Sequence, residues 1–186
     1  MLEINFLPFK NLETERLLLR RITNDDADEI LALRGNPKTM EYIPRPRAKN
    51  KADAFDHIAM IEAKIQEGNG INWAITLKGN PKLIGIIGHY RIQPQNYRAE
   101  IGYMLLPEFH GKGIVSEAIK AAVMYGFDEM KLHSIEAVID PANTASEIVL
   151  QKNGFVKEAH LLENEYYDGK FWDTVIYSLL KRNFKR

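Results

Sequence analysis

The chain has 186 residues and a mass of 21.4 kDa, the size of one ordinary domain, which we expect to span residues 1–186. Hydrophobic residues make up 45% and charged residues 27%, a balance that excludes disordered, collagen-like and coiled-coil chains. Lys plus Arg and Asp plus Glu each number 25, so the formal net charge is zero and nucleic-acid binding through bulk charge is disfavoured.

The first third of the chain predicts one strand and two helices. The strand is expected over residues 16–22, and the helix after it ends at Gly35. Prolines in the next stretch exclude a helix there, because each pushes its predecessor toward extended geometry. A second helix is expected from about Lys51 to Glu67, where apolar residues recur at helical spacing before Gly68.

The middle of the chain predicts an antiparallel meander followed by a long helix. Three β-rich runs, over residues 71–77, 82–90 and 98–106, are separated by turn residues. From residue 114 to about 131 the period changes, and apolar residues recur every three or four positions. This segment therefore predicts an amphipathic helix.

The last third predicts a strand over 134–139, a short helix capped by Asn143, and two strands over 155–167 and 170–180. The final pair meets at Asp168-Gly169, a strong signal for a two-residue hairpin. A strand, a long helix and another strand imply a parallel crossover. The whole predicts an α/β fold, α+β in stricter usage, with a mixed, mostly antiparallel sheet of about seven strands.

The segment from Pro107 to Ile114 has the strongest pattern for a binding site. A strand ends, Gly111 and Gly113 follow, and a long helix begins. Glycines let the backbone approach a bulky anion, and the free N–H groups of a first helical turn point toward it. Lys112 adds a positive charge. A plain tight turn between strand and helix carries the same glycines, so both interpretations stay open.

Four segments resemble, in the same order, the motifs of the GNAT acyl-CoA N-acetyltransferases: Ala99-Glu100-Ile101-Gly102-Tyr103, Glu108-x-x-Gly111-x-Gly113, Asp140-Pro141-x-Asn143-x-x-Ser146 and Gly154-Phe155. With residues 12–17 at the start, the chain resembles the RimJ/RimL branch, the ribosomal-protein N-terminal acetyltransferases. The match covers about residues 11 to 181. It implies a sheet with helices on both faces, in which the strands around 100–106 and 134–139 are parallel but splay apart.

The resemblance implies that acetyl-CoA binds as a cosubstrate in the wedge between those strands. The pantetheine arm would pair with the strand edge at Met104, Leu105 and Leu106, where a backbone N–H would hold the thioester oxygen. Asn143 would contact the cofactor or act as a plain N-cap, and Lys152 would reach the phosphates or remain solvated. The main-chain amides expected to bind the pyrophosphate belong to His110, Gly111, Lys112, Gly113, Ile114 and Val115.

The implied reaction is direct acetyl transfer to a primary amine in a ternary complex. Because amines are mostly protonated at neutral pH, a base must accept a proton. Glu100 is the candidate base, and a surface carboxylate paired with Arg98 or Arg91 is the alternative. Asn143 would order a water near the thioester. Leu150 stands where many relatives carry a tyrosine acid, so either Ser146, as the resemblance implies, or water would protonate the departing sulfur, or the thiolate would leave unprotonated.

The resemblance favours a protein N-terminal amine as the acceptor. A polyamine, amino sugar or antibiotic is the alternative acceptor, and a non-catalytic acyl-CoA-binding module is the alternative class. Aromatic and imidazole side chains are candidates for the wall of the amine site, whereas Trp73 and Tyr103 are expected to pack in the core. The candidates for the wall are Tyr42, His89, Tyr90 and Tyr167.

Several absences in the sequence narrow the remaining possibilities. No cysteine is present, which excludes disulfides, thiolate metal sites and a cysteine nucleophile. The five histidines lack paired ligand spacing, so no metal is expected. The N-terminus lacks a signal-peptide pattern, and no apolar run approaches the ~20 residues that span a membrane. We therefore expect a cytoplasmic protein without a membrane or nucleic-acid partner, and a homodimer is one possible assembly.

Overall fold

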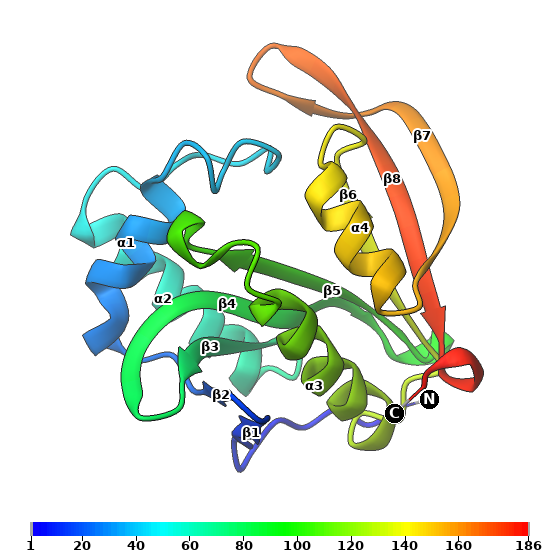
Figure 1. The fold of residues 1–186 in the computed structure, drawn as a ribbon, viewed down its shortest axis with the longest axis horizontal. Coiled ribbons are helices and arrows are strands. Elements are labelled where there is room, and N and C mark those ends of the chain that lie inside the picture. The colour runs from blue at the N-terminus through cyan, green and yellow to red at the C-terminus, as the bar shows by residue number, and fades with distance from the viewer. Residues whose placement is uncertain (1, 186) are drawn as a thin grey trace.

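The computed structural model describes residues 2–185. Within them one sheet has eight strands in the order β1-β2-β3-β4-β5-β6-β8-β7 (Figure 1). All neighbouring strands are antiparallel except β5 and β6. The strands are β1 (Leu12–Glu13), β2 (Leu17–Arg20), β3 (Ile71–Leu77), β4 (Asn80–Gln93), β5 (Arg98–Leu105), β6 (Ser134–Ile139), β7 (Val156–Tyr167) and β8 (Lys170–Leu180).

Four α-helices accompany the sheet in the described part of the chain: α1 (Ala27–Gly35), α2 (Lys51–Gln66), α3 (Ile114–Asp128) and α4 (Thr144–Lys152). Short 3-10 turns lie at Asn24–Asp26, Pro94–Asn96, Pro107–Phe109 and Lys181–Asn183. Helix α3 ends earlier than the predicted limit near 131, although Met130 beyond it is still buried. The apolar pattern therefore continues past the helix itself.

The predicted meander and hairpin are confirmed, with one strand more than expected. The extra strand, β1, has only two residues, which is too short to show an alternating pattern. At the other edge Asp168 and Gly169 adopt φ values of 51° and 80°, the left-handed geometry of a tight hairpin turn. The long β7–β8 hairpin extends from the sheet in orange and red (Figure 1).

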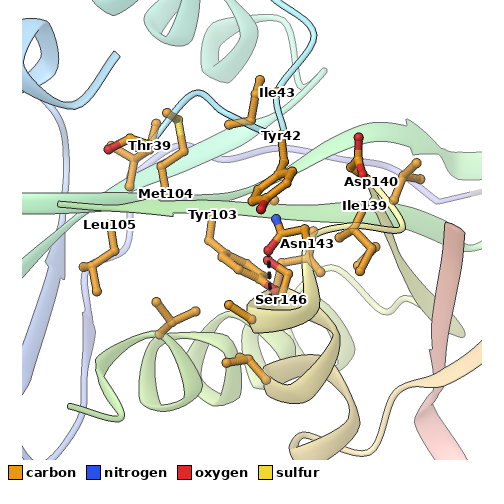
Figure 2. Close-up of a pocket in the computed structure, with 18 of the residues that line it drawn as sticks. Thr39, Tyr42, Ile43, Tyr103, Met104, Leu105, Ile139, Asp140, Asn143 and Ser146 are labelled. Atoms are coloured by element: carbon orange, nitrogen blue, oxygen red, sulfur yellow. Dashed lines mark hydrogen bonds between the residues drawn. The ribbon is translucent and has the colours of Figure 1, made fainter. Parts of the chain in front are cut away.

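The helices cover both faces of the sheet. The Trp73 ring on β3 packs edge-on against Tyr125 of α3, with ring centroids 5.0 Å apart. Figure 2 shows the helices near the N-terminus and the helices α3 and α4 on opposite sides of β5. No helix within residues 2–185 is both long and apolar enough to cross a lipid bilayer.

The parallel strands β5 and β6 pair over only three positions. Pairing starts at Arg98 with Ser134 and ends at Glu100 with Glu136. Beyond that point β5 continues to Leu105 and β6 to Ile139 without pairing to each other. The two strands therefore diverge, as the family resemblance implies, and the gap opens on the side where α3 and α4 begin.

Candidate functional site

A cavity of about 1030 Å³ lies where β5 and β6 diverge. Figure 2 shows its lining on both sides of β5. Thr39 and Met104 lie on one side, which we call the α1 side, and Tyr103, Leu105 and Ser146 lie on the other, the α3 side. Alternation of side chains along β5 explains why neighbouring residues face different sides. The cavity therefore passes through the plane of the sheet beside this strand.

The glycine loop lies at the end of the α3 side. Gly111 and Gly113 have φ values of 73° and 74°, a region that non-glycine residues rarely adopt. Gly113 is the N-cap of α3 and offers no capping side chain, so first-turn N–H groups, such as those of Val115 and Ser116, have no partner within residues 2–185. A Cβ at Gly111 would meet no atom within 4 Å. The loop therefore presents open amides that fit a diphosphate.

Hydrogen bonds and an ion pair from the turn between β1 and β2 hold the loop in place. Glu117 of α3 accepts hydrogen bonds from the Thr14 hydroxyl (2.5 Å) and from the Arg16 backbone N–H (2.9 Å) and Nε (2.6 Å). Arg16 Nη1 also donates to the Lys112 carbonyl at 3.0 Å. Burial alone would raise the pKa of Glu117, but the hydrogen bonds from Thr14 and Arg16 together outweigh burial, and the pKa is lowered. Thr14, Arg16 and Glu117 thus fix the loop, a role that the sequence did not predict.

Two of the predicted coenzyme contacts, those of Leu106 and His110, differ from the structure. The Leu106 N–H donates to the Ile84 carbonyl of β4 at 2.9 Å, and Leu106 does not line the cavity. The His110 N–H donates to the Pro107 carbonyl at 3.1 Å, so it is not a free amide, although His110 lines the cavity. Lys112 lies outside the lining, with its ammonium 5.2 Å from the centroid of the Phe109 ring.

The free edge of β5 is formed by odd-numbered residues. Because Leu106 bonds toward β4 and hydrogen-bonding direction alternates along a strand, the main chain of Leu105 and Tyr103 faces the gap. The His110 ring lies 2.9 Å from the Leu105 carbonyl and occupies that acceptor. Met104 contributes its side chain to the α1 side. The backbone donor suited to a thioester oxygen is therefore that of Leu105.

Glu100 lies at the last position of β5 that pairs with β6. Its side chain is only 16% exposed, and Arg91 Nη1 lies 3.2 Å from its Oε2. Burial raises the pKa of Glu100, Arg91 opposes that rise, and Glu136 and Glu165 add to it. A bulge between Tyr90 and Gln93, with Arg91 at φ 42°, sets the position of the arginine. Glu100 is thus both buried and paired with Arg91, whereas Arg98 pairs with Glu136.

Helix α4 contributes Asn143 and Ser146. The Asn143 Oδ1 accepts the Ser146 N–H at 3.1 Å, so Asn143 acts as an N-cap. Both residues line the cavity, and Figure 2 shows the Tyr42 hydroxyl directed toward Asn143. Burial raises the pKa of Tyr103 to about 12, and the nearby Ser146 side chain partly opposes the shift. Leu150, which stands where many relatives carry a tyrosine, is fully buried in the core.

Two of the four candidates for the amine wall do not line the cavity. Tyr42 and Tyr90 line it, but Tyr167 does not, and Trp172 does instead. His89 is fully buried and lies 2.9 Å from the Ala122 carbonyl of α3. Burial lowers the pKa of its imidazole to about 4. His89 is therefore a neutral core residue and not part of an amine site, because it points to the α3-covered face of β4.

Tyr103 also differs from its expected packing role, since it lines the cavity. Lys152 and the glycine-loop residues Ile114 and Val115 line it as well. No group of three or more His, Cys, Asp or Glu side chains placed to hold a metal ion occurs among residues 2–185. The chemistry that these residues support is anion binding at the loop and proton transfer at Glu100.

Comparison with known proteins identifies the family. Residues 16–156 match the acetyltransferase (GNAT) domain family. The uncharacterized N-acetyltransferase YoaA of Bacillus subtilis strain 168 is 39% identical over 173 residues, covering 93% of this chain and 98% of the relative. A spermidine N(1)-acetyltransferase of Vibrio cholerae is 26% identical over 159 residues, covering 86% of this chain and 90% of the relative.

A solved structure has the same fold. It is RimL, described as a ribosomal L7/L12 alpha-N-protein acetyltransferase in complex with coenzyme A, with a TM-score of 0.83 and 21% identity over 92% of this chain and 98% of that one. The spermidine acetyltransferase and the solved structure are named for different acceptors. The family match and the diverging strands lead to one conclusion: the chain belongs to the GNAT family of acetyltransferases and is an N-acetyltransferase.

Proposed function

We propose that the chain transfers the acetyl group of acetyl-CoA to the α-amine of a protein N-terminus. The observation that carries this proposal is the set of residues that line the cavity. They include two segments far apart in the chain, residues 38–45 and 172–174, which we call the rim segments, and Glu100 on β5. Such a passage suits the end of an extended chain, whose following residues leave between the two rim segments. The cytoplasm, where new protein N-termini appear, is the proposed location.

The residues on the α3 side fit acetyl-CoA. Open amides from Gly111 to Ser116 suit the pyrophosphate, and Lys152 lies at the same side of the cavity. The unpaired edge of β5 suits the pantetheine arm, and the Leu105 N–H suits the thioester oxygen. When bound, acetyl-CoA supplies an acetyl group activated as a thioester.

Glu100 is the proposed base. In the reaction the acceptor nitrogen bonds to the acetyl carbon, the carbon–sulfur bond breaks, and the nitrogen loses a proton. An ordinary carboxylate is a weak acceptor for that proton, but burial raises the pKa of Glu100 toward the working range. The carboxylate accepts the proton directly or through one water, and Arg91 favours its ionised form.

Ser146 and Tyr103 are proposed to stabilise the leaving sulfur by hydrogen bonds. A thiol has a pKa near 8.5, whereas that of Tyr103 is about 12. Complete proton transfer from this phenol to a thiolate is thus uphill by roughly 5 kcal/mol, at about 1.36 kcal/mol per pKa unit. The hydroxyl groups therefore donate hydrogen bonds without giving up their protons, and coenzyme A leaves as a thiolate.

An acceptor screen tests the proposal. The purified protein and acetyl-CoA would be mixed with peptides bearing free N-termini, with spermidine or with an aminoglycoside, and thiol release would be followed. We expect release with peptides, and mass spectrometry of fragments should place the acetyl group on the α-amine. Faster turnover of spermidine or of the aminoglycoside would assign a small-molecule acceptor. Coenzyme A binding without thiol release from any amine would favour the non-catalytic module.

A further inference from the structure

One of the three arginines that line the cavity has no carboxylate partner within residues 2–185. Arg34, in the last turn of α1, lines the cavity and is partly buried, yet its guanidinium forms no ion pair or hydrogen bond with residues 2–185. The other two arginines of the cavity are paired, since Arg91 faces Glu100 and Arg45 lies 3.8 Å from Glu165. Burial lowers the pKa of Arg34, and Arg45 adds to that effect. A charge in this position is unfavourable unless a ligand neutralises it.

Two other residues that line the cavity carry buried polar atoms that also lack partners. Thr39 Oγ1 and His57 Nε2 are both inaccessible to solvent and make no hydrogen bond, and both residues line the cavity. Burial, with Arg34 and Lys64 nearby, lowers the pKa of His57 to about 4, so the imidazole is neutral at pH 7 and can donate. Buried polar groups in folded proteins are nearly always paired, so unpaired ones in a cavity indicate a missing ligand.

Tyr90 shows on which face of the sheet Arg34 lies relative to Glu100. Tyr90 pairs directly with Glu100 across β4 and β5, and the position of a Cβ on Gly102 would lie 3.0 Å from its ring. Its hydroxyl accepts a hydrogen bond from Asn72, and Arg34 acts on it electrostatically. Arg34 therefore lies on the same face of the sheet as Glu100. One acceptor molecule can place its amine at Glu100 and another group at Arg34.

We propose that Arg34, His57 and Thr39 form a carboxylate subsite of the acceptor site. This inference rests on the proposed function and deepens it, because it selects N-termini followed closely by an acidic side chain. A guanidinium binds a carboxylate through two parallel N–H donors, and a hydroxyl and a neutral imidazole add further donors. A polyamine would instead place a second cation against Arg34, which like-charge repulsion disfavours. Arg34 is thus a specificity-determining residue.

Matched acceptors test the subsite. One pair of peptides differs only by Glu or Gln at the second residue, and a second pair compares a free amino acid with its carboxamide. We expect kcat/KM to be about tenfold or more higher for the Glu peptide than for the Gln peptide, mainly through KM. In Arg34→Gln this preference should disappear, and Arg34→Lys should retain part of it. Arg47→Gln, an exposed arginine outside the cavity, is the matched control.

The outcomes separate this inference from the proposed function. Turnover of both peptides at equal rates, or an equal loss on both in Arg34→Gln, would overturn the subsite and leave N-terminal acetylation intact. Preference for the free amino acid over all peptides would support the subsite and overturn the protein acceptor. Preference for spermidine would overturn both. Thermal unfolding of each variant shows whether it is folded.

A binding measurement keeps the subsite testable if the chosen peptides turn over slowly. In NMR spectra of the coenzyme A complex, the His57 ring signals should shift on addition of the Glu peptide, and the pKa of His57 should rise because a bound carboxylate favours its protonation. The Gln peptide should cause a smaller shift. Equal shifts with both peptides, or no shift with either, would contradict the assignment.

Discussion

Arg91 Nη1 lies 3.2 Å from Glu100 Oε2 at the point where β5 and β6 separate. Arg91 occupies a bulge of β4 with a left-handed φ of 42°, a geometry that is uncommon for a residue with a side chain. The bulge turns the guanidinium toward a carboxylate that is otherwise buried. The pair thus combines two opposing influences on the pKa of Glu100, since burial raises it and the guanidinium of Arg91 lowers it.

Replacing Glu100 by glutamine removes the proposed base and keeps its size. We expect Glu100→Gln to lower kcat by about 100-fold or more, because general-base catalysis contributes that much. The affinity for coenzyme A should not change, since Glu100 does not lie at the glycine loop. Steady-state kinetics and calorimetry measure the two effects. Glu67→Gln, on the exposed C-cap of α2, is the control, and unchanged kcat in Glu100→Gln would contradict the assignment.

Replacing Arg91 tests the electrostatic part of the pair. Arg91 lowers the pKa of Glu100, so Arg91→Gln should raise that pKa further. A base works only when deprotonated, so the acidic limb of the kcat/KM profile should move to higher pH. Arg91→Lys keeps the charge and should leave the limb close to its original position. An acidic limb that stays in place or moves to lower pH in Arg91→Gln would show that another group titrates.

The glycine loop offers a matched pair of substitutions. Gly111 and Gly79 both have positive φ, 73° and 82°, and a Cβ on either meets no atom within 4 Å. Alanine at each site should therefore lower stability by a similar amount, about 1 kcal/mol. Only Gly111→Ala should weaken coenzyme A binding, by about tenfold, through lost approach of the amides to the phosphates. Equal affinities of the two variants in calorimetry would remove the loop from the coenzyme site.

The sequence predicts elements well where a local pattern defines them. The Asp168-Gly169 turn follows from its turn residues, whereas the divergence of β5 and β6 was implied only by the resemblance to the GNAT family, and the structure confirms both. The assignment of faces on β4 fails because His89 and Tyr90 are adjacent aromatic or imidazole residues on opposite sides of one strand. Only the register and the helix above each face decide which of the two lines the cavity.

Contacts between distant segments could not be predicted either. Arg16 and Glu117 lie 101 positions apart, and nothing near either residue indicates the other. Arg34 and His57 belong to two helices, α1 and α2, whose approach depends on the long segment 36–50 between them. The roles of Glu100, Asn143 and Ser146 stay predictions, since the structure positions these residues without showing the reaction.

The last prediction concerns the effect of the buried His89 on the stability of the fold. Burial lowers the pKa of His89 from 6.5 to about 4, so the unfolded chain takes up a proton first as pH falls. Stability should therefore be full above pH 6.5 and decrease as pH falls toward 4, by about 3 kcal/mol at 1.36 kcal/mol per pKa unit. His89→Gln keeps a donor for the Ala122 carbonyl and should lose this part of the pH dependence.

Urea unfolding at pH 7.5 and pH 5 measures the change in stability, with the exposed His133→Gln as the control. Because acidic groups titrate in every variant, only the difference between the His89 and His133 variants is diagnostic, and identical slopes would mean that His89 is protonated in the folded core.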